Sequence, residues 1–260
     1  MFWSNVFLWD GSGGSVDELV EKVYRPAIRL LREDRIRQAT IAVKANLLEK
    51  LDSRPTRDVL SDLRDLAVLH QIDLATVQDD SAGAEHFTEN LRSELARIRA
   101  VVGEHAVLRG NVALGERNPF DRLQAYRELG FRWVLLDSRN VLGPYVDLLD
   151  DVIYEIGASG ALYGIFVDRR ATLLLQEATD RTSRQFQEHF PSRLDRKCYF
   201  VTVLTERDLS RASQHLWDLL DDLYSDPSVR SWRVSTLEEL FQKRKRLESP
   251  VGLAASPSVE

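Results

Sequence analysis

The fold is decided by Gly110-Asn111-Val112-Ala113-Leu114-Gly115-Glu116 and, after an amphipathic segment, by Gly130-Phe131-Arg132-Trp133-Val134-Leu135-Leu136-Asp137. Each stretch reads as a short apolar strand that ends on a carboxylate, and the segment between them reads as a helix. A strand, a helix and a second strand make one unit of a β/α-barrel, whose chemistry sits at the carboxyl ends of the strands. The two acidic groups therefore mark a candidate site.

Strand-like and helix-like segments alternate on both sides of this unit. We expect further strands at 3–9, 38–43, 72–77, 162–167 and 199–204, with helices between them, and a hairpin that joins 152–156 to 162–167. The pattern predicts an α/β fold, a (β/α) barrel or an incomplete (β/α)7-type barrel with mostly parallel strands. We expect one barrel domain over residues 1–248 and a disordered tail over 249–260, which is rich in Pro, Ser and Ala.

Composition excludes several kinds of protein. The chain has 35 basic and 41 acidic residues among 260, a formal net charge of −6, so we expect no nucleic-acid partner, because phosphate binding needs clustered excess Lys and Arg. No apolar run reaches the length of a membrane span, and the apolar start at 1–9 has no basic lead of a signal peptide. We expect a cytoplasmic protein without a membrane partner.

We expect neither a metal nor a cofactor. The five histidines show no i, i+4 pair of the kind that holds a metal on a helix. The glycine-rich stretch 11–14 lacks the spacing of a dinucleotide fingerprint and the Lys of a nucleotide-binding loop. We interpret it as a mobile loop that can cover the open end of the barrel as a lid.

Three segments carry a resemblance to a known family. The first is 23–31, with a Tyr-x-Pro stretch, followed by 41–51, with a Leu-Leu-Glu helix; the second is 110–137; the third is 199–224 together with 232–240, which has a closing Ser-x-x-Glu helix. They resemble glycoside hydrolase family 57 and its relatives on the glycoside hydrolase and polysaccharide deacetylase barrel, and they occur in the order of that family. The resemblance implies an α-glucan or oligosaccharide as the partner.

Position by position, the resemblance implies that Glu116 is the catalytic nucleophile of a retaining reaction. That mechanism requires a second carboxyl group about 5 Å away, which acts first as acid and then as base. The family has its acid in an Asp-x-Glu motif after the late strand, where this chain has Leu204-Thr205-Glu206. Three carboxylates are candidates to replace it: Glu206, Asp208 and Asp137.

Other polar and aromatic residues near the predicted strand ends are candidate sugar contacts. Polysaccharide deacetylases use adjacent aspartates, which Asp79 and Asp80 resemble, although the histidines that hold the metal there are missing here. The complete set of candidate substrate-binding residues is Trp9, Asp10, Asp79, Asp80, Trp133 and Asp168.

Two functions remain open. The first is a divergent family-57-like glycoside hydrolase or transglycosylase that acts on an α-glucan by a retaining two-carboxylate mechanism. The second is a non-catalytic relative that binds carbohydrate or a protein partner at the barrel mouth, and the missing residues favour it: Phe7-Leu8-Trp9-Asp10 has no His, whereas the family's first strand carries one.

Overall fold

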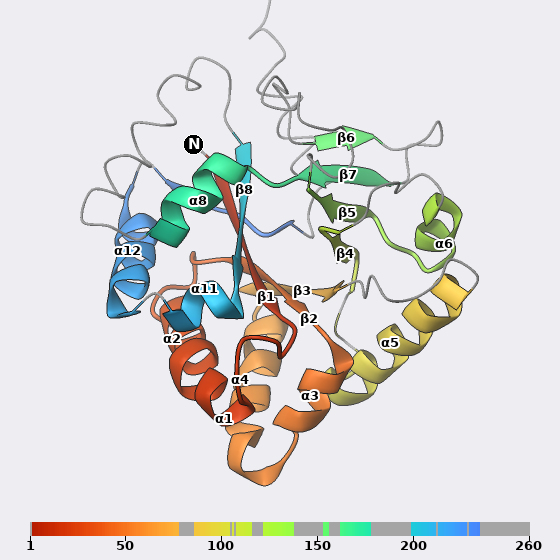
Figure 1. Cartoon of the computed structure of the whole chain (residues 1–260), viewed down its shortest axis with the longest axis horizontal. Helices are drawn as coiled ribbons and strands as arrows, with labels where there is room; N and C mark the ends of the chain where they lie inside the picture. The colour runs from red at the N-terminus through yellow and green to blue at the C-terminus, as the bar shows by residue number, and fades with distance from the viewer. Residues whose placement is uncertain are drawn as a thin grey trace, which may run out of the picture.

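The fold is known from a computed structural model, shown in Figure 1. It describes residues 2–77, 86–104, 106, 108–115, 122–137, 153–155, 162–177, 199–211, 213–227 and 229–234. The predicted tail 249–260 lies outside these ranges, so the division of the chain into a domain over 1–248 and a tail stays a prediction. None of the described helices combines the length and the apolar character needed to cross a lipid bilayer.

One curved sheet forms the centre of the molecule. Its strands are β1 (Phe2–Trp9), β2 (Ala39–Val43), β3 (Ile72–Val77), β4 (Gly110–Ala113), β5 (Trp133–Leu136), β6 (Ile153–Glu155), β7 (Tyr163–Phe166), β8 (Tyr199–Thr205) and β9 (Arg230–Ser231). The order is β6-β7-β5-β4-β3-β2-β1-β8, and β9 also pairs with β1. All pairs are parallel except β6 with β7, which form the predicted hairpin. The expected incomplete, mostly parallel barrel is confirmed.

Hydrogen bonds from the residues that follow β7 join that side of the curved sheet to β8, the strand at the opposite edge. Two residues after β7, the backbone N–H of Asp168 donates to the carbonyl of Val201 in β8 at 2.8 Å. The backbone N–H of Val203 donates to Oγ1 of Thr172 at 3.3 Å. Among the described residues, these two hydrogen bonds connect β8 to the chain after β7, where a closed barrel would have a ladder of strand–strand hydrogen bonds.

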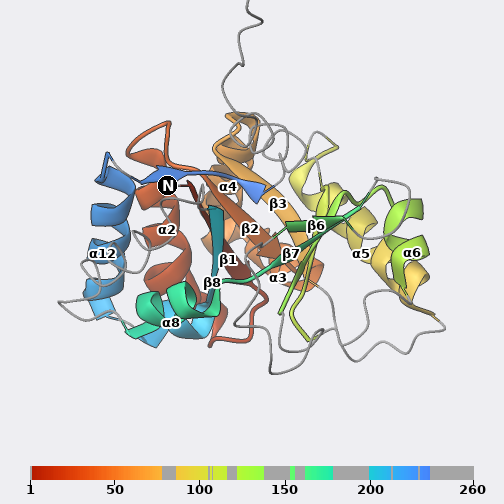
Figure 2. The same cartoon turned by 90° about the horizontal axis from the view of Figure 1, so that it is seen from above.

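Helices cover the outside of the curved sheet, as Figures 1 and 2 show. They are α1 (Val16–Leu19), α2 (Arg25–Arg32), α3 (Ala45–Leu51), α4 (Arg57–Val68), α5 (Phe87–Val102), α6 (Leu123–Glu128), α8 (Arg169–Glu177), α11 (Glu206–Arg211) and α12 (Ser213–Ser225). Neighbours contact one another in the order α8, α12, α2, α4, α3, α5 and α6. The expected alternation of strands and helices is therefore present in the described part of the chain.

A π-helical segment, Val20–Tyr24, joins α1 to α2 directly before Pro26. Proline has no N–H to donate back along the helix, so a regular α-helix would leave a carbonyl without its partner here. The N–H of Arg25 instead reaches five residues back, to the carbonyl of Val20. The sequence predicts a kink or a split at Pro26, and the structure resolves this as a wider turn.

Strand alternation divides the core into two layers. Val6 and Leu8 pack inside the barrel with apolar residues of the other strands, whereas Phe7 and Trp9 pack outside against the helices. Because alternate residues of a strand face opposite sides, each parallel strand supplies both layers. The inside layer fills the lumen beneath the open end formed by the carboxyl ends of the strands, which we call the barrel mouth.

Candidate functional site

The barrel mouth brings together the residues that follow the parallel strands. Asp10 follows β1, Lys44 follows β2, Asp137 follows β5, and Glu206 follows β8. The register Trp9↔Val43 places Asp10 beside Lys44, and alternation puts both on the side of Leu8 and Ala42, which face the lumen.

Glu116, Asp79 and Asp80 lie outside the described residues. The structure follows the chain after β4 as far as Gly115, one residue before the candidate nucleophile. The register Ala113↔Leu136 places Leu114, the first residue after β4, beside Asp137. The role of Glu116 stays a prediction.

Glu206 is a buried carboxylate with three hydrogen-bond donors. Its Oε1 accepts from the hydroxyl of Tyr24 at 2.5 Å and from the backbone N–H of Gly11 at 3.0 Å, and its Oε2 accepts from the N–H of Gly13 at 3.1 Å. Burial raises the pKa of Glu206, and nearby Asp10 adds to the rise, while the three donors act against it. Burial and the neighbouring Glu206 also raise the pKa of the Tyr24 hydroxyl.

This carboxylate fixes the glycine-rich loop that follows β1. A Cβ at Gly13 would lie 2.6 Å from Cβ of Glu206, so only glycine permits this approach. The sequence predicts a mobile loop here, but Glu206 bonds to two of its backbone N–H groups from more than 190 residues away. Tyr24, part of the Tyr-x-Pro stretch, has a place in the site that sequence reasoning missed.

Asp208 caps the helix that follows β8. The N–H and the hydroxyl of Thr205 donate to its Oδ2 at 2.9 and 2.7 Å, and the N–H of Asp208 donates back to Oγ1 of Thr205 at 3.3 Å. This reciprocal pattern is a capping box. Gln176 of α8 donates a further hydrogen bond to the same Oδ2 at 3.0 Å.

Asp137 and Arg169 form an ion pair at the mouth, between the end of β5 and the start of α8. Nε of Arg169 lies 3.1 and 3.0 Å from the two oxygens of Asp137, and Nη2 lies 2.5 Å from Oδ2. Asp168, beside Arg169, accepts the N–H of Ala171 at 2.9 Å and thereby caps α8. Arg169 thus joins Asp137, after β5, to the start of α8, where Asp168 is the cap.

The two aromatic candidates are buried inside the protein, whereas Asp10 is partly exposed. Trp9 is fully buried outside the barrel, with its ring 4.5 Å from that of Tyr24. Trp133 is fully buried in the lumen. Asp10 accepts the N–H of Ser12 at 3.0 Å and so shapes the loop after β1. Stacking of either indole on a sugar would require the protein to rearrange.

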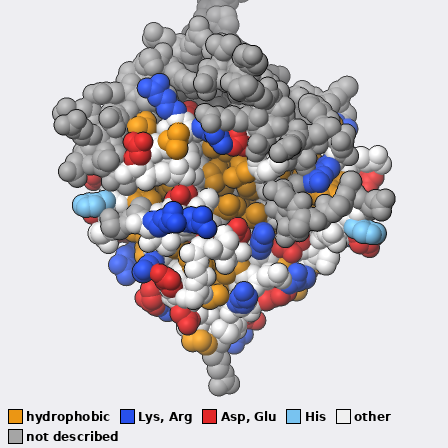
Figure 3. Space-filling view, in the orientation of Figure 1, with side chains coloured by type: hydrophobic (Ala, Val, Ile, Leu, Met, Phe, Trp, Pro, Cys, Tyr) orange, Lys and Arg blue, Asp and Glu red, His pale blue; other side chains and the backbone are white. Residues whose placement is uncertain are grey.

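Figure 3 shows that apolar side chains gather at the centre of the face turned to the viewer, with charged side chains around them.

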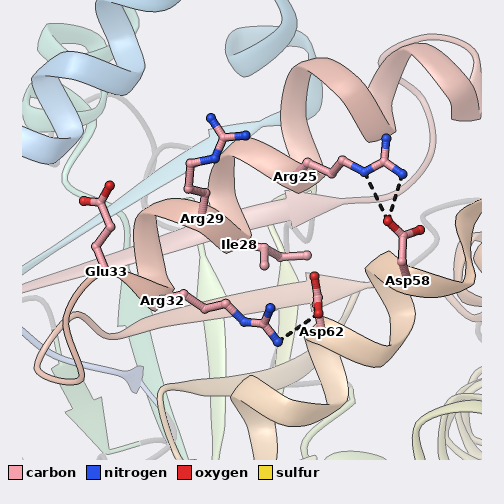
Figure 4. A pocket seen from close by; sticks show the side chains of 7 residues that line it. All are labelled: Arg25, Ile28, Arg29, Arg32, Glu33, Asp58 and Asp62. Atoms are coloured by element: carbon pink, nitrogen blue, oxygen red, sulfur yellow. Dashed lines mark hydrogen bonds and ion pairs between the residues drawn. The ribbon is translucent and has the colours of Figure 1, made fainter.

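A pocket of about 410 Å³ lies outside the barrel, between α2 and α4. In Figure 4, Arg25 points to Asp58 and Arg32 to Asp62 across this pocket. These ion pairs engage two of the three arginines that line the pocket, and the pocket lies away from the carboxyl ends of the strands, so we take the mouth as the better candidate for a ligand site.

Among the described residues, no group of three or more His, Cys, Asp or Glu side chains is arranged to hold a metal ion.

Comparisons with known proteins find the same fold in solved structures. No family model matches the chain, and no curated protein matches its sequence. The 4-alpha-glucanotransferase of Thermococcus litoralis has a TM-score of 0.67 at 16% identity, over 92% of this chain and 40% of that one. The chain thus spans well under half the length of that enzyme.

Two further structures have similar folds. The family-57 branching enzyme of Thermococcus kodakaraensis, solved with glucose, gives a TM-score of 0.66 at 13% identity over 92% of this chain and 70% of that one. A protein assigned as a polysaccharide deacetylase, from Mycobacterium smegmatis, gives 0.59 at 14% identity over 94% and 91%. At these identities the likeness shows the fold alone: the chain has a fold similar to that of the glucanotransferase, the branching enzyme and the protein assigned as a polysaccharide deacetylase.

Proposed function

We propose that this chain is a non-catalytic, family-57-like domain that binds α-glucan chains at the barrel mouth. The names of two of its structural relatives, a 4-alpha-glucanotransferase and a branching enzyme solved with glucose, supply the ligand class. The proposal adopts the second of the two functions that the sequence leaves open.

The observation that carries the proposal is that each of the three described candidate acids is hydrogen-bonded to other groups of the protein. Glu206 anchors the loop after β1, Asp208 caps α11, and Asp137 accepts hydrogen bonds on both oxygens from Arg169. A retaining glycosidase needs two carboxyl groups that reach the same glycosidic bond. Each of these three has instead taken a structural partner.

The polar groups at the mouth suit binding. Each charged group at the mouth follows a strand: Asp10 follows β1, Lys44 follows β2, Asp137 follows β5, and its partner Arg169 follows β7. Below them lies the apolar lumen. Binding sites for small molecules combine apolar walls with a few charged or polar groups that fix orientation. Sugar hydroxyls both donate and accept, so they can bond to carboxylate and guanidinium groups alike.

Calorimetric titration with maltoheptaose tests the proposal, together with a reducing-sugar assay on soluble starch. The parent is expected to bind without releasing reducing ends. Arg169→Gln is expected to weaken binding about tenfold or more, because a hydrogen bond to a charged group contributes about 1.5–3 kcal/mol. Arg25→Gln, in the outer pocket, is the matched control and should bind like the parent. Absence of binding by the parent would overturn the carbohydrate assignment.

The second candidate is a retaining hydrolase or transglycosylase with Glu116 as the nucleophile. One observation favours it: burial raises the pKa of Glu206 at the end of β8, and a raised pKa is the property that a catalytic acid needs. Release of reducing ends or transfer products by the parent, abolished in Glu116→Gln while the circular dichroism spectrum is unchanged, would establish this candidate and displace the first.

A further inference from the structure

The pocket between α2 and α4, which we call the outer pocket, encloses about 410 Å³. Small-molecule sites in proteins measure about 300–1,000 Å³, so this pocket has room for a compact organic molecule. Its lining holds three arginines, three carboxylates and one apolar side chain, so its formal charges balance. The lining residues are Arg25, Ile28, Arg29, Arg32, Glu33, Asp58 and Asp62.

Two ion pairs cross the outer pocket from α2 to α4. Nε and Nη2 of Arg25 donate to Oδ2 of Asp58 at 3.2 and 2.8 Å. Nη2 of Arg32 lies 2.8 Å from Oδ1 of Asp62. The hydrogen bond from Arg25 holds the pKa of the Asp58 carboxyl below its ordinary value, so this carboxylate is charged near neutral pH. Both of these arginines are therefore already engaged by a carboxylate.

Arg29 is different from the other two arginines of the pocket. It lies four residues after Arg25 and three before Arg32, on the same face of α2. Within the described part of the chain its guanidinium forms no hydrogen bond or ion pair, and Figure 4 shows it turned away from both aspartates. Glu33, the third carboxylate of the lining, accepts a hydrogen bond from Nη1 of Arg37 at 2.8 Å. The guanidinium of Arg29 can therefore bind a ligand group without breaking a described contact.

One carboxylate oxygen of the pocket can do the same. Arg32 contacts Oδ1 of Asp62, whereas Oδ2 of that side chain has no partner in the residues that the structure describes. In Figure 4, Ile28 is seen between Arg29 and Asp62. Ile28 is 3% exposed, so it supplies an apolar floor. The pocket thus offers one cationic donor and one anionic acceptor on either side of an apolar side chain.

These groups determine the charge type of a ligand. A simple anion would bind Arg29 but would also meet the carboxylates of Asp58 and Asp62, which repel it. A simple cation would bind Asp62 but would meet the arginines. A zwitterion places its negative group on the guanidinium and its positive group on the carboxylate, and it leaves the charge balance of the lining unchanged. The planar fork of an arginine matches a carboxylate, which can accept two parallel hydrogen bonds.

Size limits the ligand further. Residues three or four apart on a helix have Cβ atoms about 5–6 Å apart, so Arg29 lies about one helical turn from Arg32, the residue that contacts Asp62. A molecule that joins Arg29 to Asp62 is therefore small, with its two charged groups close together. An α-amino acid has this form, because its carboxylate and its ammonium group share one carbon atom.

We propose that the outer pocket binds a free α-amino acid with an aliphatic side chain. Its carboxylate accepts hydrogen bonds from Arg29, its ammonium group donates to Oδ2 of Asp62, and its side chain packs on Ile28. This site is separate from the barrel mouth, so it stands or falls independently of glucan binding there.

Calorimetric titration of the full chain with L-leucine tests the proposal. The parent is expected to bind leucine. It should bind 4-methylpentanoate, which lacks the ammonium group, and leucinamide, which lacks the carboxylate, about tenfold or more weakly, because each analogue loses hydrogen bonds between charged groups. Absence of leucine binding at millimolar concentrations, or equal binding of the three compounds, would overturn the proposal.

Two arginine variants locate the bound leucine. Arg29→Gln is expected to weaken leucine binding about tenfold or more, with the urea midpoint unchanged, because the guanidinium has no described contact to lose. Arg35→Gln is the matched control: Arg35 is also exposed and has no ion pair among the described residues, but it does not line the pocket. Unchanged binding in Arg29→Gln, or an equal loss in Arg35→Gln, would contradict the assigned site.

Asp62→Asn separates the two ends of the ligand. It is expected to weaken binding of leucine and to leave binding of 4-methylpentanoate unchanged, since that compound has no ammonium group to donate to Asp62. An equal loss for both compounds, or no loss for leucine, would show that Asp62 does not hold the ammonium group and would refute the zwitterion.

Discussion

Tyr24→Phe tests the hydrogen bond that a buried hydroxyl donates to the buried carboxyl of Glu206. Tyr24 is fully buried and Glu206 is 1% exposed, so water cannot replace the lost donor without rearrangement. Hydrogen bonds that involve a charged group contribute about 1.5–3 kcal/mol. We expect the substitution to lower the free energy of unfolding by about 2 kcal/mol and the melting temperature by about 4–8 °C.

The loss should depend on pH, with a definite sign. The folded-state pKa of Glu206 is raised above its ordinary value of 4.5, mainly by burial. Stabilisation linked to this group is therefore complete below pH 4.5 and is lost as the pH rises through the folded-state pKa. The Tyr24 hydroxyl opposes the rise in pKa by donating to the ionised carboxylate. Its removal should therefore cost more at pH 8 than at pH 4.5.

Urea unfolding followed by tryptophan fluorescence between pH 4.5 and 8 measures this difference. Tyr224→Phe is the matched control, because it removes another buried tyrosine hydroxyl, one that donates to the backbone carbonyl of Gln38 at 3.1 Å. Its cost should be about 1 kcal/mol and nearly independent of pH, since the acceptor does not titrate in this range. A cost of Tyr24→Phe that stays constant with pH would refute the assigned partnership with Glu206.

Three further substitutions test the packing and the helix ends. Gly110→Ala places a Cβ 1.9 Å from the ring of Trp133 in the lumen, so it should destabilise the protein by about 1–3 kcal/mol in urea unfolding, and a neutral effect would contradict the placement of that ring. Thr205→Ala removes one half of the capping box with Asp208 and should cost about 1 kcal/mol in the same assay; an unchanged midpoint would argue against the cap. Gly130→Ala places a side chain at φ 78° in open space, so a loss of about 1–2 kcal/mol should come from backbone strain alone, and its absence would argue against the left-handed turn after α6.

The prediction of the barrel rested on local sequence patterns, such as the alternation of side chains along a strand. The alternation of Val6 and Leu8 with Phe7 and Trp9 is a property of neighbouring residues, and it predicts a strand that is buried on both faces, as β1 is. The unit around 110–137 likewise predicts β4 and β5 and their parallel pairing. Elements such as these are fixed by short-range periodicity, which a single sequence displays.

The contacts of the site were harder to predict from the sequence than the strands were, because these contacts join distant segments of the chain. Tyr24, Gly11 and Gly13 meet Glu206 across 182 to 195 residues, and no local pattern marks such a meeting. At the end of β8, position along the strand is a misleading guide to the residue that faces the lumen. Thr205 continues the inward alternation of Val201 and Val203, whereas Glu206 begins α11 and bonds toward the loop after β1.

The carboxylates illustrate the same limit. Placement at a strand end predicts that Asp137 lies at the mouth, and it does, but nothing in the sequence predicts that Arg169 takes both of its oxygens. The capping box of Asp208 was readable in principle from the Thr-x-x-Asp spacing that starts at Thr205. The catalytic role of Glu116 remains a prediction.

The join between β7 and β8 gives the barrel a built-in point of expansion. A ring of paired strands widens most easily where the fewest bonds must break, and elsewhere in this ring a whole ladder opposes stretching. In the part of the chain that the structure describes, one hydrogen bond joins Asp168 to Val201 and another joins Thr172 to Val203, in place of a ladder between β7 and β8. A bulky guest entering the lumen would therefore displace α8 outward before it parted any two paired strands.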